Sequence, residues 1–313
     1  MDKIIERIER EAGIPGLAAL LAERLEPTDL QSLLLEVARR RTQRRSPGDV
    51  LADYETNRLV RPSRISPTAL TAWETVAWKT LPAEFEPLAL SPLAPLGACS
   101  VVAAVDQDKV VTTIRTAEVV SDATNILALE CAVRRRALLR AAPRSAEAVH
   151  LATSHRLLRP LRPPHPRMAA HFALFGLCSA GRDTGSLQFE LSTLRRHLSF
   201  YLTALRTYGG ESVPLRVSLS DFAPEPRIAP LETELLAPLR SAFPGVECVF
   251  DAERLGGRGY YRDLCFHIDL LRPDGEIIQL ADGGSVDWTQ KYLNSAKERL
   301  IISGIGSDRV CSL

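Results

Sequence analysis

Residues 157–181 read LLRPLRPPHPRMAAHFALFGLCSAG, and this stretch decides the fold. An apolar segment runs up to Arg159, a proline-rich loop covers 160–166, and a second apolar segment begins at His171. Short apolar runs bounded by prolines are typical of buried strands, because proline lacks a backbone donor and ends regular pairing. The stretch therefore predicts two extended segments joined by a long loop.

Outward from this stretch, helical and extended segments follow one another without a fixed period. Apolar residues recur at helical spacing in 123–139 and 187–208, which predicts one long helix on each side. Because strands neither repeat regularly nor alternate strictly with helices, the sequence predicts an α+β fold with a mixed, largely antiparallel sheet. The other predicted strands are QDKVVTTIR (107–115), VPLRVSLS (213–220), VECVF (246–250), YYRDLCFHIDLL (260–271), EIIQLA (276–281) and IISGIG (301–306), and a further helix is WTQKYLNSAKERL (288–300).

The first sixty residues differ in character from the rest. Their apolar residues recur at helical spacing, with a break at Gly13 and Pro15. Residues 1–60 are therefore predicted to form a helical N-terminal extension, and residues 61–313 the core domain. One helix of the extension ends in the basic cluster RRRTQRRSPG (39–48), which could contact an acidic partner or nucleic acid. The alternative is a solvated helix end, where cations interact favourably with the helix dipole.

Composition limits the classes of partner. The 313 residues carry 39 Lys and Arg against 38 Asp and Glu, so bulk charge does not hold the protein on nucleic acid or a membrane. No apolar run is long enough for a transmembrane helix, and the N-terminus lacks the apolar core of a signal peptide. Six scattered cysteines fit reduced thiols, so we expect a cytoplasmic protein. The histidines at 150, 155, 165 and 171 match no common ligand spacing, so no metal site is expected.

Six motifs, read in order, resemble the catalytic core of class II aminoacyl-tRNA synthetases, and within them the histidyl-tRNA synthetases. The helix after Ser66-Pro67 and the strand FEPLALSP (85–92) resemble the first motif of the class, which forms its dimer interface. The segment TTIRTAEVVSDATNILALECAVRR (112–135) resembles the strand and helix that come next. Residues 157–181 resemble the second motif, with matches at Arg159, Arg162-Pro163, His171-Phe172, Gly176 and Gly181.

The remaining motifs lie near the C-terminus. GGRGYYRDLCFH (256–267) resembles the double-tyrosine segment of the histidyl enzymes, and GGSVD (283–287) resembles their glycine pair followed by Asp287. ISGIGSDRV (302–310) resembles the third motif of the class, with Gly306, Asp308 and Arg309 in its glycine, acid and arginine places.

The resemblance implies a nucleotide site. Two arginines would hold ATP from opposite sides of an antiparallel sheet and stabilise charge as a carboxylate attacks the α-phosphate. Arg159 and Arg309 would be this pair, Arg115 a third ATP ligand, and Mg²⁺ would bind with the nucleotide. The implied ligand pocket contains Glu118, Tyr260, Tyr261, Arg258 and Cys178.

Several positions depart from the family pattern. Leu161 replaces the acid of the second motif, while Leu174 and Cys178 occupy the Gln and Glu places that hold the amino acid. Burying an ammonium group against Leu and Cys is costly unless another acid takes over. Histidine recognition as the family performs it is therefore not expected unless an acid such as Glu118 or Asp183 reaches the pocket.

Two further departures concern catalysis and tRNA. Gly256 stands at the place of the family's catalytic arginine, which Arg258 or Arg254 would replace only if the backbone shifts. The chain also ends just after the third motif, so we expect no anticodon-binding domain and no tRNA binding.

Two functions from different classes fit this pattern. In the first, the protein is a paralogue without tRNA-charging activity that binds a nucleotide or amino acid as a regulatory or assembly subunit of a partner enzyme. The regulatory subunit of ATP phosphoribosyltransferase is a relative of this kind. In the second, it is an ATP-dependent ligase that adenylates an amino acid or another carboxylate for a non-tRNA acceptor, which the retained arginines favour. Both predict a homodimer built on the helix at 67–81 and the strand ending at Pro92.

Overall fold

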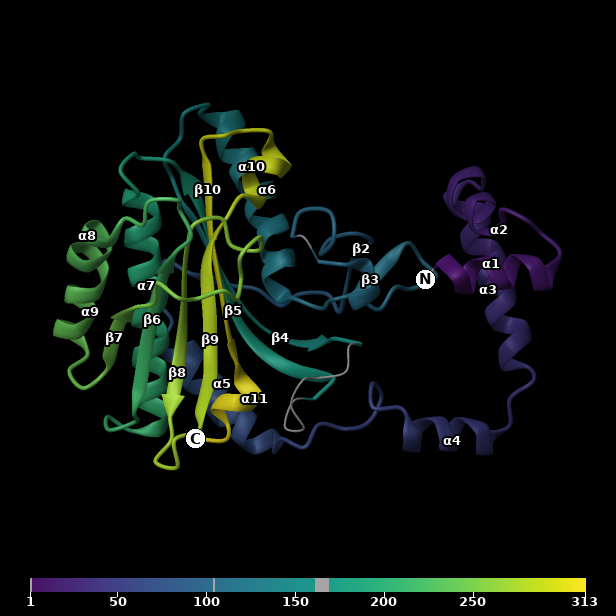
Figure 1. Ribbon diagram of the computed structural model, residues 1–313, viewed down its shortest axis with the longest axis horizontal. Coiled ribbons are helices and arrows are strands. Elements are labelled where there is room, and N and C mark those ends of the chain that lie inside the picture. Colours follow the sequence, from purple (N-terminus) through teal and green to yellow (C-terminus); the bar gives the residue numbers. More distant parts are fainter. Residues whose placement is uncertain (1, 104, 161–168) are drawn as a thin grey trace.

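The computed structural model describes residues 2–103, 105–160 and 169–313. Its centre is an eight-stranded sheet with the strand order β1–β4–β5–β10–β9–β8–β6–β7 (Figure 1). The pairs β1–β4 and β6–β7 are parallel, and the other neighbouring pairs are antiparallel. The strands are β1 (Glu86–Pro87), β4 (Val149–Leu158), β5 (His171–Arg182), β6 (Leu215–Asp221), β7 (Glu247–Phe250), β8 (Leu264–Leu271), β9 (Ile277–Val286) and β10 (Glu298–Gly306). The predicted α+β fold with a mixed, largely antiparallel sheet is confirmed.

Helices flank this sheet, and a small ribbon lies beside it. The ribbon pairs β2 (Leu93–Pro95) with β3 (Ala117–Val119). The helices of the core are α5 (Pro67–Thr80), α6 (Ala123–Ala141), α7 (Gln188–Gly209), α8 (Ile228–Leu231), α9 (Ala237–Ala242), α10 (Trp288–Leu293) and α11 (Ser307–Val310), with a π-helical segment, Glu232–Leu236, between α8 and α9. The long helices α6 and α7 fall close to the predicted ranges.

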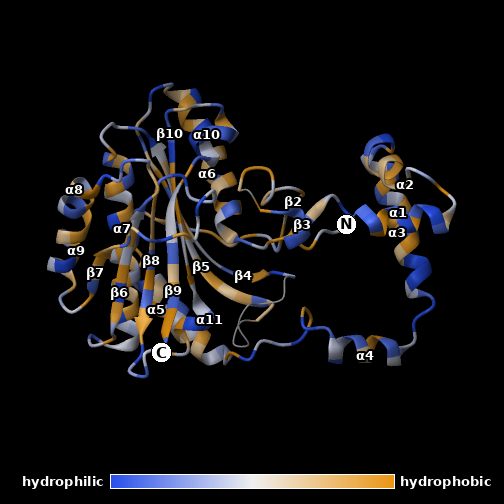
Figure 2. Ribbon diagram, viewed as in Figure 1, coloured by the Kyte–Doolittle hydropathy of each residue, from blue (hydrophilic) through white to orange (hydrophobic). Residues whose placement is uncertain are grey.

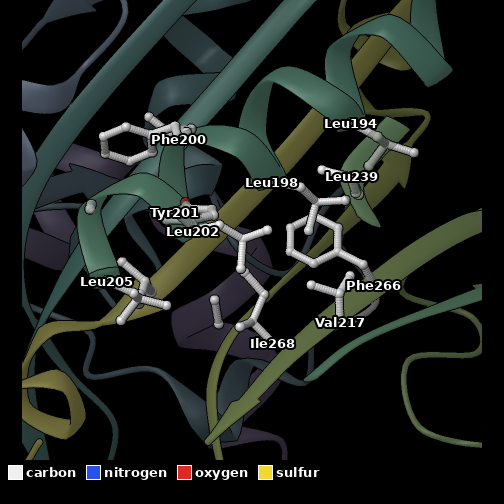
Figure 3. Close-up of a cluster of buried hydrophobic side chains, with 14 of the residues drawn as sticks. Leu194, Leu198, Phe200, Tyr201, Leu202, Leu205, Val217, Leu239, Phe266 and Ile268 are labelled. Atoms are coloured by element: carbon white, nitrogen blue, oxygen red, sulfur yellow. The ribbon is translucent and has the colours of Figure 1, made fainter. Parts of the chain in front are cut away.

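The helix α7 packs on one face of the sheet. Its residues Leu194, Leu198 and Leu205 recur at helical spacing and are fully buried. They lie close to strand residues such as Phe266 and Ile268 (Figure 3). Burying one such side chain stabilises the fold by about 1.5–3 kcal/mol relative to its exposed form. This apolar layer fixes the sheet and leaves its opposite face for other contacts.

The helices α6 and α10 pack on that opposite face. Along β5, Leu177 belongs to the cluster of α7, whereas its neighbour Cys178 belongs to a second cluster with Leu127 of α6 and Trp288 of α10. This alternation is the two-residue period of a strand buried on both faces. The second face carries the candidate site.

Four predicted elements differ from the structure. The strand predicted over 85–92 is reduced to β1 (Glu86–Pro87), and residues 88–92 belong to no strand. Residues 107–115 do not form a strand, because Gln107–Lys109 is a 3₁₀ turn and Thr116 has a positive φ of 52°. The helix predicted over 288–300 ends at Leu293, since Asn294 is left-handed, and the apolar residues from Glu298 onward enter β10. The strand predicted from Tyr260 begins only at Leu264, because the double tyrosine lies in a loop.

The N-terminal residues form four helices that stand apart from the sheet (Figure 1). They are α1 (Asp2–Ala12), α2 (Leu17–Ala19) with a π-helical continuation Leu20–Arg24, α3 (Pro27–Thr42) and α4 (Pro47–Thr56). None of their described residues is buried. Figure 2 shows hydrophobic residues along these helices, and several of them, such as Ile4, Leu33 and Val50, are exposed. Among the described residues, no helix is long and apolar enough to cross a membrane.

Candidate functional site

Arg159 directly follows the last residue of β4 and is half exposed. Its Nε donates to the Ser121 carbonyl at 3.0 Å, and its Nη2 lies 3.4 Å from Asp122 Oδ2. The guanidinium also stacks 5.2 Å from the centre of the Phe172 ring. These contacts hold the guanidinium beside the start of α6 while leaving part of it open to a ligand.

Arg309 lies in α11, directly after β10. Its aliphatic carbons run over Gly306, and its Nη1 donates to the Gln279 carbonyl. Burial lowers the pKa of this guanidinium, and the nearby Arg159 lowers it further, whereas Asp282 opposes both. Two arginines from motifs far apart in sequence are therefore close enough for the charge of Arg159 to lower the pKa of Arg309, and for both charges to lower the pKa of Asp282.

That acid, Asp282, stands on the sheet face of α6. In the strand register it pairs with Gly304, which in turn pairs with Gly176, so one row of the sheet runs from this carboxylate across two glycines. Among the residues that the structure describes, none donates a hydrogen bond to the carboxylate of Asp282, whereas its backbone pairs with Gly304 and His267 in the sheet. An acid without a partner next to two glycines is available to a ligand.

The charge of Asp282 reflects its surroundings. Burial raises the pKa of its carboxyl above the ordinary value, and the second acid, Asp122, raises it further. Three cations lower the same pKa, namely those of Arg254, Arg159 and Arg309. The site thus brings three guanidinium groups and two carboxyl groups together.

Asp122 joins several parts of the site. As the N-cap of α6, it accepts hydrogen bonds at Oδ1 from the Thr124 backbone amide (3.0 Å) and hydroxyl (2.8 Å). Its Oδ2 faces Arg159 and accepts from the Tyr260 hydroxyl at 3.4 Å. An N-cap acid is stabilised by the helix dipole, so this carboxylate is well placed to hold charged neighbours.

The two tyrosines form an aromatic wall beside these acids. The rings of Tyr260 and Tyr261 meet edge to face at 5.0 Å, and Tyr260 meets Trp288 in the same way at 5.6 Å. A Cβ built on Gly284 would lie 2.7 Å from Tyr261 Cδ1, so only glycine admits this ring against β9. Burial raises the pKa of both hydroxyls well above their ordinary value, so they stay neutral donors.

The structure distinguishes the two arginines that flank Gly256. The guanidinium of Arg254 lies 5.9 Å from the centre of the Tyr261 ring and acts on Asp282. Its Nη1 is buried without a hydrogen-bond partner among the described residues. Arg258 instead stacks over Phe222 at 4.6 Å. Arg254 is therefore the arginine that the fold brings to the site.

Other predicted residues lie in different surroundings. Glu118 is fully buried, and its carboxylate accepts from the backbone amides of Gly97 (2.9 Å) and Cys99 (3.1 Å) and from Gln107 Nε2 (3.0 Å). Its carboxylate oxygens therefore hold the 97–107 loop in place. Arg115 lies exposed in the turn of the small ribbon, where its backbone amide donates to Thr113 Oγ1 at 3.2 Å.

Cys178 and Leu174 face α6 but do not replace the acids of the family pattern. The Cys178 thiol is fully buried and donates to the Thr124 carbonyl at 3.4 Å, and burial raises the pKa of this thiol well above its ordinary value. Leu174 packs over Gly304. Asp183 pairs with Arg299 at 2.8 Å near the far end of β5, and Asp287 pairs with Lys291 at 2.9 Å.

The glycines of the motifs fall into two groups. Gly176, Gly304 and Gly306 lie on the site face, whereas Gly181 faces the Phe189 ring and is required for packing α7. Gly283 lies tightly against Ser303 and Phe266. The predicted departure at Leu161 and the predicted match at Arg162-Pro163 lie outside the described residues.

Two residues of the site were not predicted from the sequence. Asp282 could be found only from the strand register, but Asp122 carries a local signal, because an Asp before Ala-Thr at the start of an amphipathic helix is a typical N-cap. The part of the chain that the structure describes contains no group of three His, Cys, Asp or Glu residues able to hold a metal ion.

We compared the sequence and the fold with those of known proteins. No family model matches the chain, and no curated protein is detectably similar in sequence. Solved structures do match. The apo histidyl-tRNA synthetase of S. aureus aligns with a TM-score of 0.58 and 14% identity over 80% of this chain and 68% of that chain. The fold is that of a class II synthetase-like core.

Two further structures agree with this assignment. A protein described as an ATP phosphoribosyltransferase regulatory subunit/histidyl-tRNA synthetase from Bacillus halodurans C aligns with a TM-score of 0.60 and 13% identity, covering 80% of this chain and 82% of that chain. The RNA binding domain of threonyl-tRNA synthetase from Cryptosporidium parvum Iowa II aligns at 0.56 and 10%, covering 78% and 62%. The resemblance predicted from the six motifs is confirmed at the level of the fold.

Proposed function

We propose that this chain is a synthetase-like paralogue that does not charge tRNA and binds a small molecule as a regulatory or assembly subunit. A nucleotide is the first candidate ligand and an amino acid is the second. The observation that carries the proposal is that Arg159 and Arg309, from two distant motifs, both lower the pKa of Asp282, whose carboxylate accepts no hydrogen bond among the described residues. Arginine forks suit phosphate oxygens, and the glycine row beside Asp282 allows close approach.

The residues that surround the site support binding without charging. On β5, Leu174 and Cys178 stand where the family has its Gln and Glu. The carboxylate of Glu118 already accepts hydrogen bonds from the backbone amides of Gly97 and Cys99. ATP with Mg²⁺ fits the charges, because three arginines would hold the phosphates and the free carboxylate of Asp282 is an oxygen ligand available to the cation. The cation would come with the nucleotide, since the described residues hold no group of metal ligands of their own.

A direct test is isothermal titration calorimetry with ATP and Mg²⁺. Arg159→Ala and Arg309→Ala should each weaken binding at least tenfold, because each removes a charge-assisted contact to phosphate. Arg140→Ala is the matched control, since Arg140 is an exposed arginine at the other end of α6. Equal loss in all three variants, or no binding by the unaltered protein, would contradict the proposal.

The regulatory role, the assembly and the location are further parts of the proposal. One matching structure is described as a regulatory subunit, so we propose a partner enzyme for this chain as well. We also propose a homodimer built on α5 and the segment from β1 to Pro92, which light scattering at micromolar concentration would reveal. Six free cysteines are consistent with a cytoplasmic location.

A second candidate function is adenylation of a carboxylate for a non-tRNA acceptor. Arg254 favours it, because its buried Nη1 lacks a partner and a charge of this kind beside the phosphates stabilises a developing negative charge. Exchange of pyrophosphate into ATP that depends on an added amino acid, and that is lost in Arg254→Ala, would establish the ligase. Absence of exchange in the ATP-bound protein supports the regulatory role.

A further inference from the structure

The N-terminal arm, α1–α4, joins the core through a short segment that contacts sequence neighbours of three site residues. We call residues 58–63 the strap. The Arg58 guanidinium donates to the Pro160 carbonyl, the Arg61 carbonyl lies 2.6 Å from His171 Nε2, and Ser63 Oγ lies 3.3 Å from Asp308 Oδ2. Each contacted core residue is the sequence neighbour of one site residue: Pro160 of Arg159, His171 of Phe172, and Asp308 of Arg309.

Asp308 connects the strap to the third motif through hydrogen bonds. Its Oδ1 accepts from the Ala173 amide of β5 at 2.9 Å, while its Oδ2 accepts from Ser63. One carboxylate thus ties the strap, β5 and α11 together. Because α11 is a single short turn that also carries Arg309, the placement of that guanidinium depends on these hydrogen bonds.

The strap also reaches the arm itself. The guanidinium of Arg61 stacks 5.2 Å from the centre of the Tyr54 ring in α4, and the carbonyl of the same residue faces His171. The other ring nitrogen of His171 lies 3.1 Å from Arg156 Nη1, so Nδ1 accepts there and Nε2 donates to the strap. A continuous path of contacts therefore runs from α4 to the strand that carries Phe172.

We propose that the strap positions Arg159 and Arg309, so that the N-terminal arm and the ligand site are energetically coupled. Ser63 and Arg58 are positioning residues, because they act on the site through Asp308 and Pro160. Such coupling is reciprocal: whatever shifts the strap changes ligand affinity, and ligand binding changes the strap by the same factor. The ligand part of this inference rests on the proposed function, whereas the link between strap and site does not.

The first test needs no ligand and uses the full chain. Hydrogen exchange of peptides covering 157–160 and 306–310 should accelerate at least threefold in Ser63→Ala, because Asp308 loses a donor. Ser63→Thr, which keeps the hydroxyl, should restore the original rate. Ser32→Ala is the matched control, since its hydroxyl bonds only within α3, to the Thr28 carbonyl at 2.8 Å. Unchanged exchange in Ser63→Ala would overturn the proposal.

The second test measures the coupling to ligand. In Ser63→Ala and Arg58→Ala, the Kd for ATP should rise at least threefold, and saturating ATP should slow exchange across 57–66 in the unaltered protein. Arg44→Ala, an arm arginine outside the strap, should change neither. ATP that binds with equal affinity in all variants would contradict the coupling. If ATP does not bind the unaltered protein, the proposed function fails, and the ligand-free exchange result still decides the strap.

Discussion

Arg135 of α6 and Glu298 of β10 form a two-point ion pair in the interior of the protein. Arg135 Nε donates to Glu298 Oε2 at 2.8 Å and Nη2 donates to Oε1 at 2.9 Å, and both side chains have an exposed fraction of zero. The guanidinium also donates to the Glu147 and Ser145 carbonyls. The pair thus fastens α6, the helix capped by Asp122, to β10, the strand that ends shortly before Arg309.

Removing one partner should be costly. Glu298→Ala leaves a buried guanidinium without its counter-charge, so we expect the free energy of unfolding to fall by about 3–5 kcal/mol. The double variant Arg135→Met/Glu298→Met should recover much of this loss, because neither side then buries an unpaired charge. Urea unfolding of the single and double variants measures the difference. A double variant less stable than Glu298→Ala would show that the pair contributes more than it costs.

Asp122 allows its capping role to be separated from its charge. Asp122→Ala removes the N-cap of α6 and should destabilise the protein by about 0.5–2 kcal/mol. Asp122→Asn keeps a good cap, so its stability should stay close to that of the unaltered protein. Both variants remove a negative charge beside Arg159 and should therefore strengthen binding of ATP or inorganic pyrophosphate. Chemical unfolding and calorimetry distinguish the two effects, and equal stability of both variants would exclude the cap.

The packing of Tyr261 depends on Gly284, which is distant from it in the sequence but adjacent to it in the fold. Gly284→Ala would push a methyl group against the Leu264 carbonyl and the Tyr261 ring. We expect a loss of about 1–3 kcal/mol, as for other overpacked interiors. Gly256→Ala is the control, because a Cβ there meets nothing within 4 Å and its φ is not positive. Thermal unfolding should separate the two, and a neutral Gly284→Ala would mean that the ring moves freely.

The sequence predicted the layers of this protein better than its site. The strands around 157–181 and the helices α6 and α7 follow from local apolar periodicity, because the residues that recur with the period of each element are the ones that it buries in the core. Arg159 and Arg309 both lower the pKa of one acid, Asp282, and their role as ATP ligands stays a prediction. Glu118 fits the same kind of pattern, yet the loop at 97–107 uses its oxygens, and that loop conformation is not encoded near Glu118.

Asp282 shows the opposite case. It directly precedes the GGSVD motif, but the motif does not mark Asp282 itself. Only the register with Gly304 places its carboxylate beside the glycines of the neighbouring strands. In the same way, the choice of Arg254 over Arg258 depends on a loop whose Gly257 and Gly259 adopt positive φ angles of 92° and 82°. Long-range pairing and loop geometry are the two features that a single sequence leaves open.

A buried chain of polar groups predicts how stability depends on pH. His150 Nδ1 lies 2.7 Å from Ser179 Oγ, which lies 2.8 Å from His197 Nε2, and His197 Nδ1 lies 2.8 Å from Ser303 Oγ. Burial lowers the pKa of His150 to about 4 and lowers that of His197 well below its ordinary value. Both imidazoles are therefore neutral in the folded protein and can each donate only one hydrogen bond along this chain.

The sign of the effect follows from proton uptake. Below the unfolded-state pKa of about 6.5, the unfolded chain binds protons that the folded protein excludes. Stability is therefore complete above pH 6.5 and falls as the pH drops toward 4, by up to about 1.4 kcal/mol per pH unit for each histidine. His197→Gln should lower the overall stability but also flatten the slope between pH 6.5 and 4.5, because one titrating group is gone. Urea unfolding at pH 7.5, 6.0 and 5.0 tests this, and a slope unchanged by the substitution would show that His197 is protonated in the folded state.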